Sequence, residues 1–248
     1  MSEMISFGGG VNSVAMTIML VNDEWRGPIV FADTGGEHPE TYCYLTYFDK
    51  WLRERGLEIT RLSFETNPDL YQHDKRIGSS LGSTLYDYSY SAGIIPLLAT
   101  RWCSVTFKRD PLEAWRKAQG IDVSLVGICA DETRRVRDDP TVRYPLVDAG
   151  ITREGCKRVI RAAGLEVPRK SGCFFCPGQR LSQWRDLYQH YPELYERAAE
   201  LERNAAARCQ KWATLDPHGQ SLDQMRERRW QGQTEMDLSE WIPCICTL

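Results

Sequence analysis

A run of small residues near the start of the chain, Ser6-Phe7-Gly8-Gly9-Gly10-Val11-Asn12-Ser13, limits the possible folds more than any other stretch. The apolar residues before it predict a short buried strand, and those after it recur at helical spacing. Glycines let a backbone approach a ligand closely, and the unpaired N–H groups at the start of a helix favour an anion. The stretch therefore predicts a phosphate-binding cradle, with candidate ligands Ser6, Gly8, Gly9, Gly10, Asn12 and Ser13. The alternative is a glycine-rich turn that only connects strand and helix.

The spacing of these glycines argues against two common nucleotide-binding loops. The stretch lacks the Gly-x-x-x-x-Gly-Lys-Ser/Thr pattern of the Walker loop, and it lacks the Gly-x-Gly-x-x-Gly pattern of dinucleotide-binding folds. A phosphate bound here would belong to another class of nucleotide enzyme.

A second loop is predicted beside this cradle. Residues 28–32 and 59–64 have the apolar content of strands, and a long amphipathic helix is predicted between them. This strand-helix order predicts a parallel sheet, in which loops at the carboxyl ends of strands meet at the ligand crevice. We therefore expect Asp33, Thr34 and Gly35, which follow the second strand, to lie near the cradle. The alternative is that this loop only caps the following helix.

Two adjacent arginines follow another predicted strand, at residues 123–128. Arg134 and Arg135 would stand at the same edge of the sheet, where their guanidinium groups suit a phosphate or sulfate. The alternative is a solvated charged turn.

Residues 67–93 show no sustained period and predict a mobile loop with one short helix at most. The tyrosines of this segment either stack on a base or pack the loop.

The C-terminal part of the chain predicts helices. Residues 152–163 have the pattern of an amphipathic helix with Thr152 as its N-cap, and residues 181–204 predict two helices broken near Pro192. Their charges alternate in sign, which is typical of a solvated face.

Cysteines form the second chemical signal of this sequence. The pair Cys173-x-x-Cys176 can direct two thiolates at one metal, and Cys103 and Cys156 are candidates to complete the set. Four sulfurs suit zinc or an iron-sulfur cluster equally well, and a buried pair of inert thiols is the alternative. A terminal pair, Cys244 and Cys246, can relay sulfur or resolve a mixed disulfide, or it can belong to a frayed tail.

Composition narrows the setting of this chemistry. The 248 residues carry a net charge of -3, so no global basic field argues for nucleic acid, although a local patch remains possible. No apolar run approaches the ~20 residues that cross a bilayer, and we expect a cytoplasmic protein without a membrane partner. In that compartment nine cysteines favour ligands, redox groups or buried thiols over disulfides.

These motifs together resemble the phosphoadenosine phosphosulfate (PAPS) reductase-like family of the PP-loop superfamily. The glycine run is similar to the family's Ser-Gly-Gly-x-Asp-Ser loop, with Asn12 in place of Asp. The segment from Asp33 to Thr41 is similar to its Asp-Thr-Gly-x-x-x-Pro-Glu-Thr element, and Gly127 to Thr133 is similar to its Gly-Ile-x-x-x-Glu-Ser element. Lys108-Arg109-Asp110-Pro111-Leu112 is similar to its Lys-x-x-Pro-Leu element. The resemblance covers roughly residues 4–180.

The resemblance implies a doubly wound α/β fold of the adenine nucleotide alpha hydrolase-like, Rossmann-like type, with residues 1–180 as the nucleotide-binding domain and residues 181–248 as a helical extension. It implies ATP or PAPS/APS as the nucleotide, with Mg²⁺ to offset the phosphate charge. It also implies a 4Fe-4S cluster, with zinc as the alternative, on Cys103, Cys173 and Cys176, and Cys156 or a C-terminal cysteine as a fourth ligand. Lys108, Cys244 and Cys246 are the candidate catalytic residues.

Three functions follow from this resemblance. The first is adenylation of an acceptor, a nucleobase or nucleic acid, followed by sulfur transfer with a sulfur or electron donor protein. The second is reduction of PAPS or APS to sulfite by a tail cysteine, although the family's Glu-Cys-Gly-Leu-His element is missing. The third is a nucleotide-sensing module with a structural metal.

Overall fold

A parallel β-sheet forms the centre of the molecule, in a computed structural model that describes residues 1–208 and 213–230. The strand order is β3-β2-β1-β4-β5, and every neighbouring pair is parallel. The strands are β1 (Glu3–Ser6), β2 (Ile29–Ala32), β3 (Ile59–Leu62), β4 (Val123–Val126) and β5 (Val142–Arg143). Because β1 lies between β2 and β4, the chain reverses its direction of progress across the sheet there. The predicted doubly wound α/β fold is confirmed.

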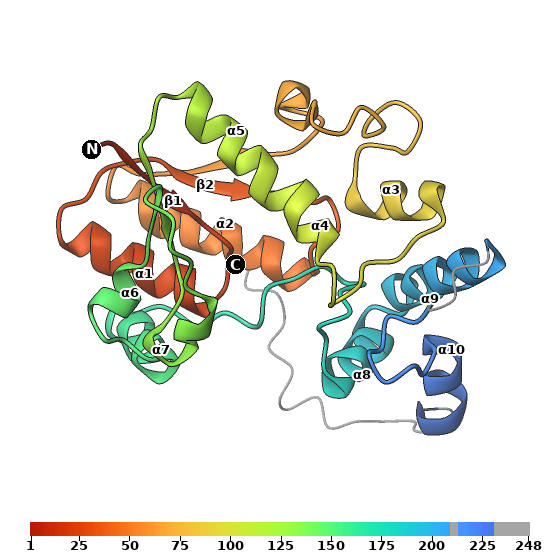
Figure 1. The fold of residues 1–248 in the computed structure, drawn as a ribbon. Helices are drawn as coiled ribbons and strands as arrows, with labels where there is room; N and C mark the ends of the chain where they lie inside the picture. The colour runs from red at the N-terminus through yellow and green to blue at the C-terminus, as the bar shows by residue number, and fades with distance from the viewer. Residues whose placement is uncertain (209–212, 231–248) are drawn as a thin grey trace.

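Helices cover both faces of the sheet (Figure 1). On one face α1 (Val11–Asn22), α2 (Pro39–Arg53) and α7 (Arg153–Ala162) bury their apolar sides against the strands. On the other face the side chains of Met4, Val30 and Leu62 pack against residues of α5 (Asp110–Ala118) and η1 (Pro68–Tyr71). The alternating directions of strand side chains therefore supply two separate apolar layers.

The remaining helical segments connect or extend this layered core. They are α3 (Leu85–Ala92), α4 (Trp102–Ser104), the π-helical turn η2 (Val105–Arg109), the 3-10 segment η3 (Ala130–Arg135), α6 (Pro145–Asp148), α8 (Leu181–His190), α9 (Pro192–Ala207), α10 (Leu222–Met225) and the π-helical turn η4 (Arg226–Trp230).

A second hydrophobic core lies beside the sheet. It joins side chains of residues 71–107, such as Tyr71 and Phe107, to the cysteine loop and to helices α8 to α10, through Trp184 and Tyr195. The predicted boundary at residue 180 falls within this shared core, and the division into two domains stays a prediction. Figure 1 shows α8, α9 and α10 grouped at one end of the molecule, next to α3.

The segment 67–93 differs from the mobile loop predicted from its composition. It contains η1 and α3, and Thr84 caps α3 by accepting a hydrogen bond from the backbone N–H of Asp87 (3.1 Å). The tyrosines Tyr71, Tyr86 and Tyr88 are buried in the second core. These rings therefore pack in the core and stabilise the fold. The sequence alone did not decide between packing and stacking on a base, because the tyrosines stand among polar residues.

The predicted C-terminal helices are confirmed. Thr152 caps α7 by accepting a hydrogen bond from the backbone N–H of Gly155 (3.3 Å). Helix α8 ends at His190 and α9 begins at Pro192, because proline cannot continue a helix but fits its first turn.

Candidate functional site

The glycine run forms the predicted turn between β1 and α1. Gly9 has a φ of 68°, a backbone conformation that favours glycine, and Gly10 is the residue that caps α1. The Ser13 hydroxyl donates to the carbonyl of Gly10 (3.0 Å) and accepts from its backbone N–H (3.2 Å). The first turn of α1 thus begins at the carboxyl edge of the sheet, where its N–H groups can bind an anion.

A glycine that the sequence analysis did not assign fixes the shape of this cradle. Gly127 follows β4, and a Cβ atom there would lie 2.8 Å from the backbone nitrogen of Ser13. Only glycine lets the end of β4 approach the first turn of α1 so closely. The repeated strand-then-loop pattern was a signal for this residue, because the end of each inner strand faces the cradle.

Asn12 ties the cradle to two other segments. Its Nδ2 donates to Glu132 Oε2 (2.8 Å) and to Cys129 Sγ (3.1 Å), and its Oδ1 accepts from Arg153 Nη1 (3.2 Å). Burial, and then the neighbouring carboxylates Asp131 and Glu132, raise the pKa of Cys129 to about 12. The thiol therefore keeps its proton and donates to Glu132 (3.2 Å). This network holds α1, η3 and α7 together around the predicted phosphate site.

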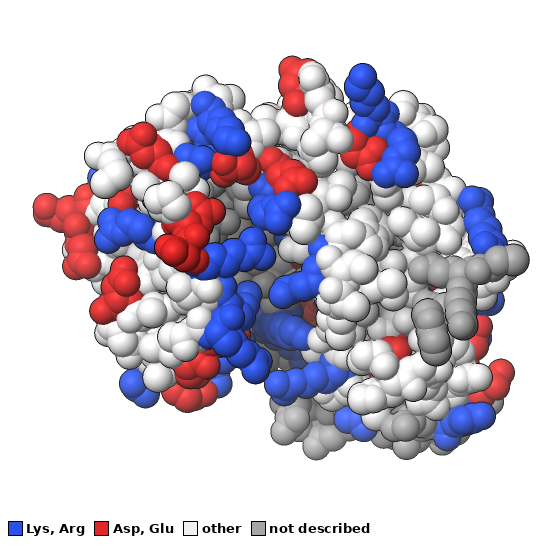
Figure 2. All heavy atoms as spheres, viewed as in Figure 1, with Lys and Arg blue, Asp and Glu red and all other residues white. Residues whose placement is uncertain are grey.

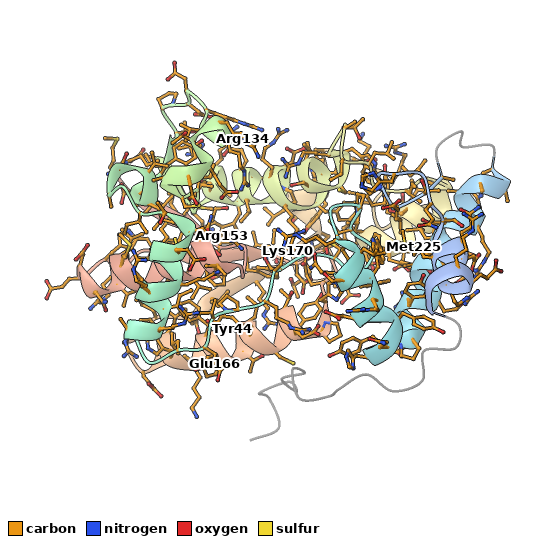
Figure 3. The ribbon with its side chains drawn as sticks, turned by 90° about the horizontal axis from the view of Figure 1, so that it is seen from below. Tyr44, Arg134, Arg153, Glu166, Lys170 and Met225 are labelled. Carbon is orange, nitrogen blue, oxygen red and sulfur yellow. The ribbon has the colours of Figure 1, made fainter. Side chains whose placement is uncertain are left out.

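The two arginines of η3 have different surroundings. Arg135 forms a salt bridge with Glu132 (2.9 Å), while Arg134 is exposed and labelled in Figure 3 on the loop above α7. Both follow β4, as the sequence predicted. Arg134 is therefore the arginine of this pair that can turn toward a phosphate without breaking a salt bridge.

The loop after β2 is held by its own hydrogen bonds. Asp33 Oδ1 accepts from the backbone N–H of Gly35 (2.8 Å) and from the hydroxyl of Tyr42 (2.7 Å). Thr34 is buried, and its hydroxyl donates to Glu37 (3.1 Å) and lies 3.3 Å from Cys173 Sγ. Asp33 and Gly35 thus hold the shape of the loop, whereas the Thr34 side chain lies against Cys173.

Backbone pairing joins this loop to the cysteine loop. Glu37 and Cys173 form an isolated antiparallel bridge, flanked by the hydrogen bonds His38 N–H to Gly172 O (2.9 Å) and Phe174 N–H to Gly36 O (2.9 Å). The pairing brings residues separated by more than a hundred positions to the same edge of the sheet. It is the contact that places the cysteines next to the Asp33 loop.

Three of the four predicted metal-ligating cysteines belong to the second core, where Cys176 is an electrostatic neighbour of both Cys103 and Cys173. Burial, and then the proximity of Cys176, raise the pKa of Cys103. Burial, and then Glu37, raise the pKa of Cys173 well above its usual value, and Cys176 acts in the same direction. We call Cys103, Cys173 and Cys176 the thiol site.

A buried ion pair adjoins the thiol site. Lys108 Nζ lies 2.7 Å from Glu37 Oε1, and the Glu37 side chain is only 1% exposed. Burial alone would lower the pKa of Lys108, but the carboxylate of Glu37 outweighs it and raises the pKa above its usual range. The other oxygen of Glu37, Oε2, is buried and has no hydrogen-bond partner within residues 1–208 and 213–230. Sequence analysis found Lys108 but missed Glu37, whose position in the loop after β2 was the available signal.

One further predicted ligand, Cys156, does not join the thiol site. Cys156 is fully buried on α7 in the core against the sheet, a different core from that of Cys173. Cys244 and Cys246 lie outside the described residues. Within residues 1–208 and 213–230, no three histidine, cysteine or acidic side chains are spaced to hold one metal ion.

A cavity of about 470 Å³ opens next to the cradle. Its lining begins at Gly9 and Val11 and continues over α2, α7, the segment 167–170 and the start of α8. Five cationic side chains line it, from Arg153, Lys157, Arg169, Lys170 and Arg180, against two carboxylates, from Glu40 and Asp186. We call these five residues the basic lining. Sequence analysis missed them because they are dispersed among acidic residues along the chain.

Fold and site together define a class of protein: an α/β protein with a parallel sheet, whose glycine turn at the carboxyl edge has the geometry of an anion-binding turn. Residues 2–145 match the phosphoadenosine phosphosulfate reductase domain. The chain belongs to this family, as its motifs predicted.

Relatives of the whole chain include two bacteriophage proteins. An uncharacterized 37.8 kDa protein in the gpa 5' region of Escherichia phage 186 is 24% identical over 83% of this chain and 75% of its own length. An uncharacterized nin region protein, ORF290, of Escherichia phage lambda is 25% identical over 71% of this chain and 66% of its own length. Among solved structures, a phosphoadenylyl-sulfate (PAPS) reductase from Candida auris, in a phosphate complex, is 13% identical, with a TM-score of 0.46 over 69% of this chain and 80% of that one.

Within residues 1–208 and 213–230, no helix has both the length and the apolar character needed to cross a bilayer.

Proposed function

We propose that this protein is an enzyme that binds ATP or a related adenine nucleotide, adenylates an acceptor and delivers sulfur to it from the thiol site. The acceptor would be a nucleobase or nucleic acid, and a separate protein would supply sulfur or electrons. The observation that carries the proposal is the Glu37–Cys173 bridge, because it puts the thiol site beside the Asp33 loop at the edge that holds the cradle.

The cradle residues suit the phosphates of the nucleotide. Backbone N–H groups of the Gly8–Gly10 turn and of the first turn of α1 would bind phosphate oxygens, with Ser6, Asn12 and Ser13 as neighbouring side chains. Arg153, already hydrogen-bonded to Asn12 (3.2 Å), adds a positive charge at the same point. Mg²⁺ prefers oxygen ligands, and the carboxylate of Glu132 beside Asn12 is of the right kind to hold it.

Adenylation needs a positioned nucleotide and a stabilised leaving group. The acceptor oxygen attacks the α-phosphate, the bond to the β-phosphate breaks, and pyrophosphate leaves with the electron pair. A sulfide-level sulfur from the donor would then attack the acceptor atom that carries this oxygen, and the bond to the oxygen would break so that AMP leaves with the electron pair. Arg134 and Arg153 would offset the charge that develops on the leaving pyrophosphate. Asp33 and Gly35 would contact the nucleoside, and the Tyr42 hydroxyl fixes the orientation of the Asp33 carboxylate (2.7 Å).

The thiol site suits a soft metal centre in its chemistry. Thiolates are the usual ligands of 4Fe-4S clusters and of zinc, and three cysteines share one core here, near the positive charge of Lys108. A cluster held by Cys103, Cys173 and Cys176 would supply an iron atom that can bind an external sulfur donor. Lys108 would offset the negative charge of the three thiolates, while Glu37 keeps the ammonium group in place (2.7 Å).

Metal analysis tests the thiol site. We expect about four irons and four acid-labile sulfides per chain in protein purified without oxygen, with absorption near ~400 nm. The double change Cys173→Ser, Cys176→Ser should abolish all of these signals. The matched control is Cys156→Ser, a buried cysteine of the other core, which should keep them. One zinc and no iron in the wild type would contradict the proposed sulfur chemistry.

Pyrophosphate release tests the nucleotide half of the proposal separately. ATP incubated with the protein and its acceptor should give AMP and pyrophosphate in equal amounts, and Arg153→Gln should slow this release. Tight ATP binding without AMP formation, with any nucleobase or nucleic acid offered, would instead favour a nucleotide-sensing module.

Reduction of a sulfonucleotide is a second candidate, favoured by the match of residues 2–145 to the reductase domain family. Here a cysteine thiolate would attack the sulfur of PAPS or APS and release the nucleotide, and a second thiol would then release sulfite by forming a disulfide. Thioredoxin-dependent sulfite production that is lost in Cys244→Ser or Cys246→Ser, with metal content unchanged, would support this reaction. Equal activity of the wild type and the double variant would exclude a role for the tail cysteines.

A further inference from the structure

The basic lining gives one face of the molecule a charge opposite to that of the chain. The cavity carries five cations against two carboxylates, while the chain as a whole has a net charge of -3. Figure 2 shows lysine and arginine side chains gathered around a hollow in the middle of the molecule. Concentrating like charges around a concave surface costs free energy unless an anion binds there.

Two of the five cations have no acidic partner among the residues that the structure describes. Arg169 pairs with Glu40 (3.1 Å), and Lys157 pairs with Glu154 (2.5 Å). By contrast, Lys170 and Arg180 form no salt bridge with any carboxylate in the described part of the chain, and Lys170 donates to the carbonyl oxygen of Gly178. Both side chains belong to exposed residues, so their charges are available to a ligand.

The basic lining is drawn from three separate segments of the chain. Arg153 stands at the cradle, through its hydrogen bond to Asn12, whereas Arg180 precedes the first residue of α8. Lys170 lies between them in the chain, three residues before Cys173, and Figure 3 shows it near Arg153 in the centre of the molecule. The cations therefore run from the phosphate site to the start of a separate helix.

The dimensions and the aromatic residues of the cavity favour a single strand. A volume of about 470 Å³ is that of a small-molecule pocket, which admits an unpaired nucleotide but not a base-paired duplex. Tyr191 lines the cavity and is partly exposed, so its ring can stack on a base. Cations that follow a backbone together with an aromatic stacking surface are the features of single-strand binding sites.

We propose that the cavity between α2, α7 and α8 binds a single-stranded nucleic acid, whose phosphates contact Lys170 and Arg180 and whose target nucleotide enters next to Gly9. This inference rests on the proposed function, since the bound strand would be the acceptor of the transferred sulfur. The location would bring an acceptor next to the nucleotide in the cradle, because Gly9 and Val11 line the same cavity.

Fluorescence anisotropy with labelled single-stranded RNA, single-stranded DNA and duplex DNA tests the proposal. We expect the single strands to bind and the duplex to bind at least tenfold more weakly. The variant Lys170→Gln, Arg180→Gln should weaken single-strand binding at least tenfold. Because each lost phosphate contact removes about 0.7 from the slope of log affinity against log salt, the slope should fall by about 1.4 between about 50 and 200 mM salt.

The matched control removes the same charges elsewhere. Lys117→Gln, Arg61→Gln changes two exposed cations on α5 and β3 and should leave single-strand binding within twofold of the wild type. Equal weakening by both double variants would overturn the proposal, because the binding would then reflect only net charge. Absence of single-strand binding in a protein that binds ATP would also overturn it.

ATP affinity separates this inference from the proposed function. The Lys170→Gln, Arg180→Gln variant should bind ATP as the wild type does, and a parallel loss of ATP binding would assign the cavity to the nucleotide instead. If the strands bind as expected but no AMP forms with any of them, the inference stands and the proposed adenylation fails. The comparison of RNA with DNA identifies which acceptor the site prefers.

Discussion

The cradle and the thiol site lie at the same edge of the sheet but handle charge in opposite ways. The cradle presents backbone N–H groups and exposed cations to solvent, so its charges are ready for a ligand. The thiol site buries its charges: Glu37 is almost inaccessible and is neutralised by Lys108. Solvent stabilises the charges of an open site when no anion is bound, so they cost little free energy. A buried charge is costly unless another group of the protein neutralises it.

Their surroundings explain this difference. The cradle stands on the core between the sheet and helices α1, α2 and α7, where the strands fix its position. The thiol site belongs to the second core, which is built from helices and long connections. Buried polar groups in that core must find partners among side chains and loops, because no strand ladder supplies them. The two sites should therefore respond differently to substitution.

Breaking the buried pair should have the largest effect. Lys108→Met leaves the Glu37 carboxylate buried without a counter-charge, and we expect the free energy of unfolding to fall by about 3–5 kcal/mol. Chemical denaturation measures this change. Glu37→Gln in the same chain should restore part of the loss, because it removes the unpaired charge. Equal stability of Lys108→Met and the wild type would mean that Glu37 does not depend on Lys108 for a counter-charge.

A second buried carboxylate of this core should make stability depend on pH. Glu202 on α9 accepts hydrogen bonds from the backbone N–H groups of Leu215 (2.6 Å) and Leu222 (2.7 Å). Burial raises the pKa of Glu202 from 4.5 to about 7. The folded state therefore binds this proton more tightly than the unfolded state, so the contribution is complete below pH 4.5 and is lost as the pH rises through about 7.

Denaturation curves at several pH values measure this contribution. Relative to Glu202→Gln, the wild type should lose about 3 kcal/mol of stability between pH 4.5 and 7. The acidic neighbours Asp216 and Asp223, which also raise the pKa of Glu202, remain in both proteins and cancel in the comparison. A pH-independent difference between the two proteins would contradict the assignment.

Adding one carbon at the cradle should lower the stability less than the preceding changes do, but it should weaken ATP binding strongly. In Gly127→Ala the new Cβ would lie 2.8 Å from the Ser13 nitrogen and push α1 away from β4. We expect a loss of about 1–3 kcal/mol in unfolding free energy, together with a strong loss of ATP binding by calorimetry. Gly172→Ala is the control, since a Cβ there would contact nothing within 4 Å. Unchanged ATP affinity in Gly127→Ala would separate the cradle from nucleotide binding.

The smallest effect should come from adding a negative charge to the cradle. Asn12→Asp would place a second carboxylate next to Glu132, whose Oε2 lies 2.8 Å from Asn12 Nδ2. Arg153 offsets part of the repulsion. We therefore expect the free energy of ATP binding to become less favourable by about 1 kcal/mol, which is roughly a fivefold lower affinity. The double variant Asn12→Asp, Glu132→Gln keeps the same net charge as the wild type and should recover the affinity. No recovery would show that the two positions act independently.

Much of the fold and the cradle was predictable because it rests on local patterns. The glycine run, the apolar strands and the helical periodicity behind Ser13 are contiguous, and the rules for parallel sheets then place the Asp33 and Arg134 loops at one edge. Thr152 as the cap of α7 and the break at Pro192 follow from the same local chemistry.

The sequence by itself determined the strand and helix order, the parallel sheet and the position of the anion cradle. Only the tertiary structure decided which cysteines share a core, since Cys103, Cys173 and Cys176 belong to the second core while Cys156 lies in the other. It also decided that Glu37 pairs with Lys108, and that five dispersed cations line one cavity. The physical reason is range: strand, helix and turn preferences act over a few neighbouring residues, whereas these contacts join segments that only the packing of two cores brings together.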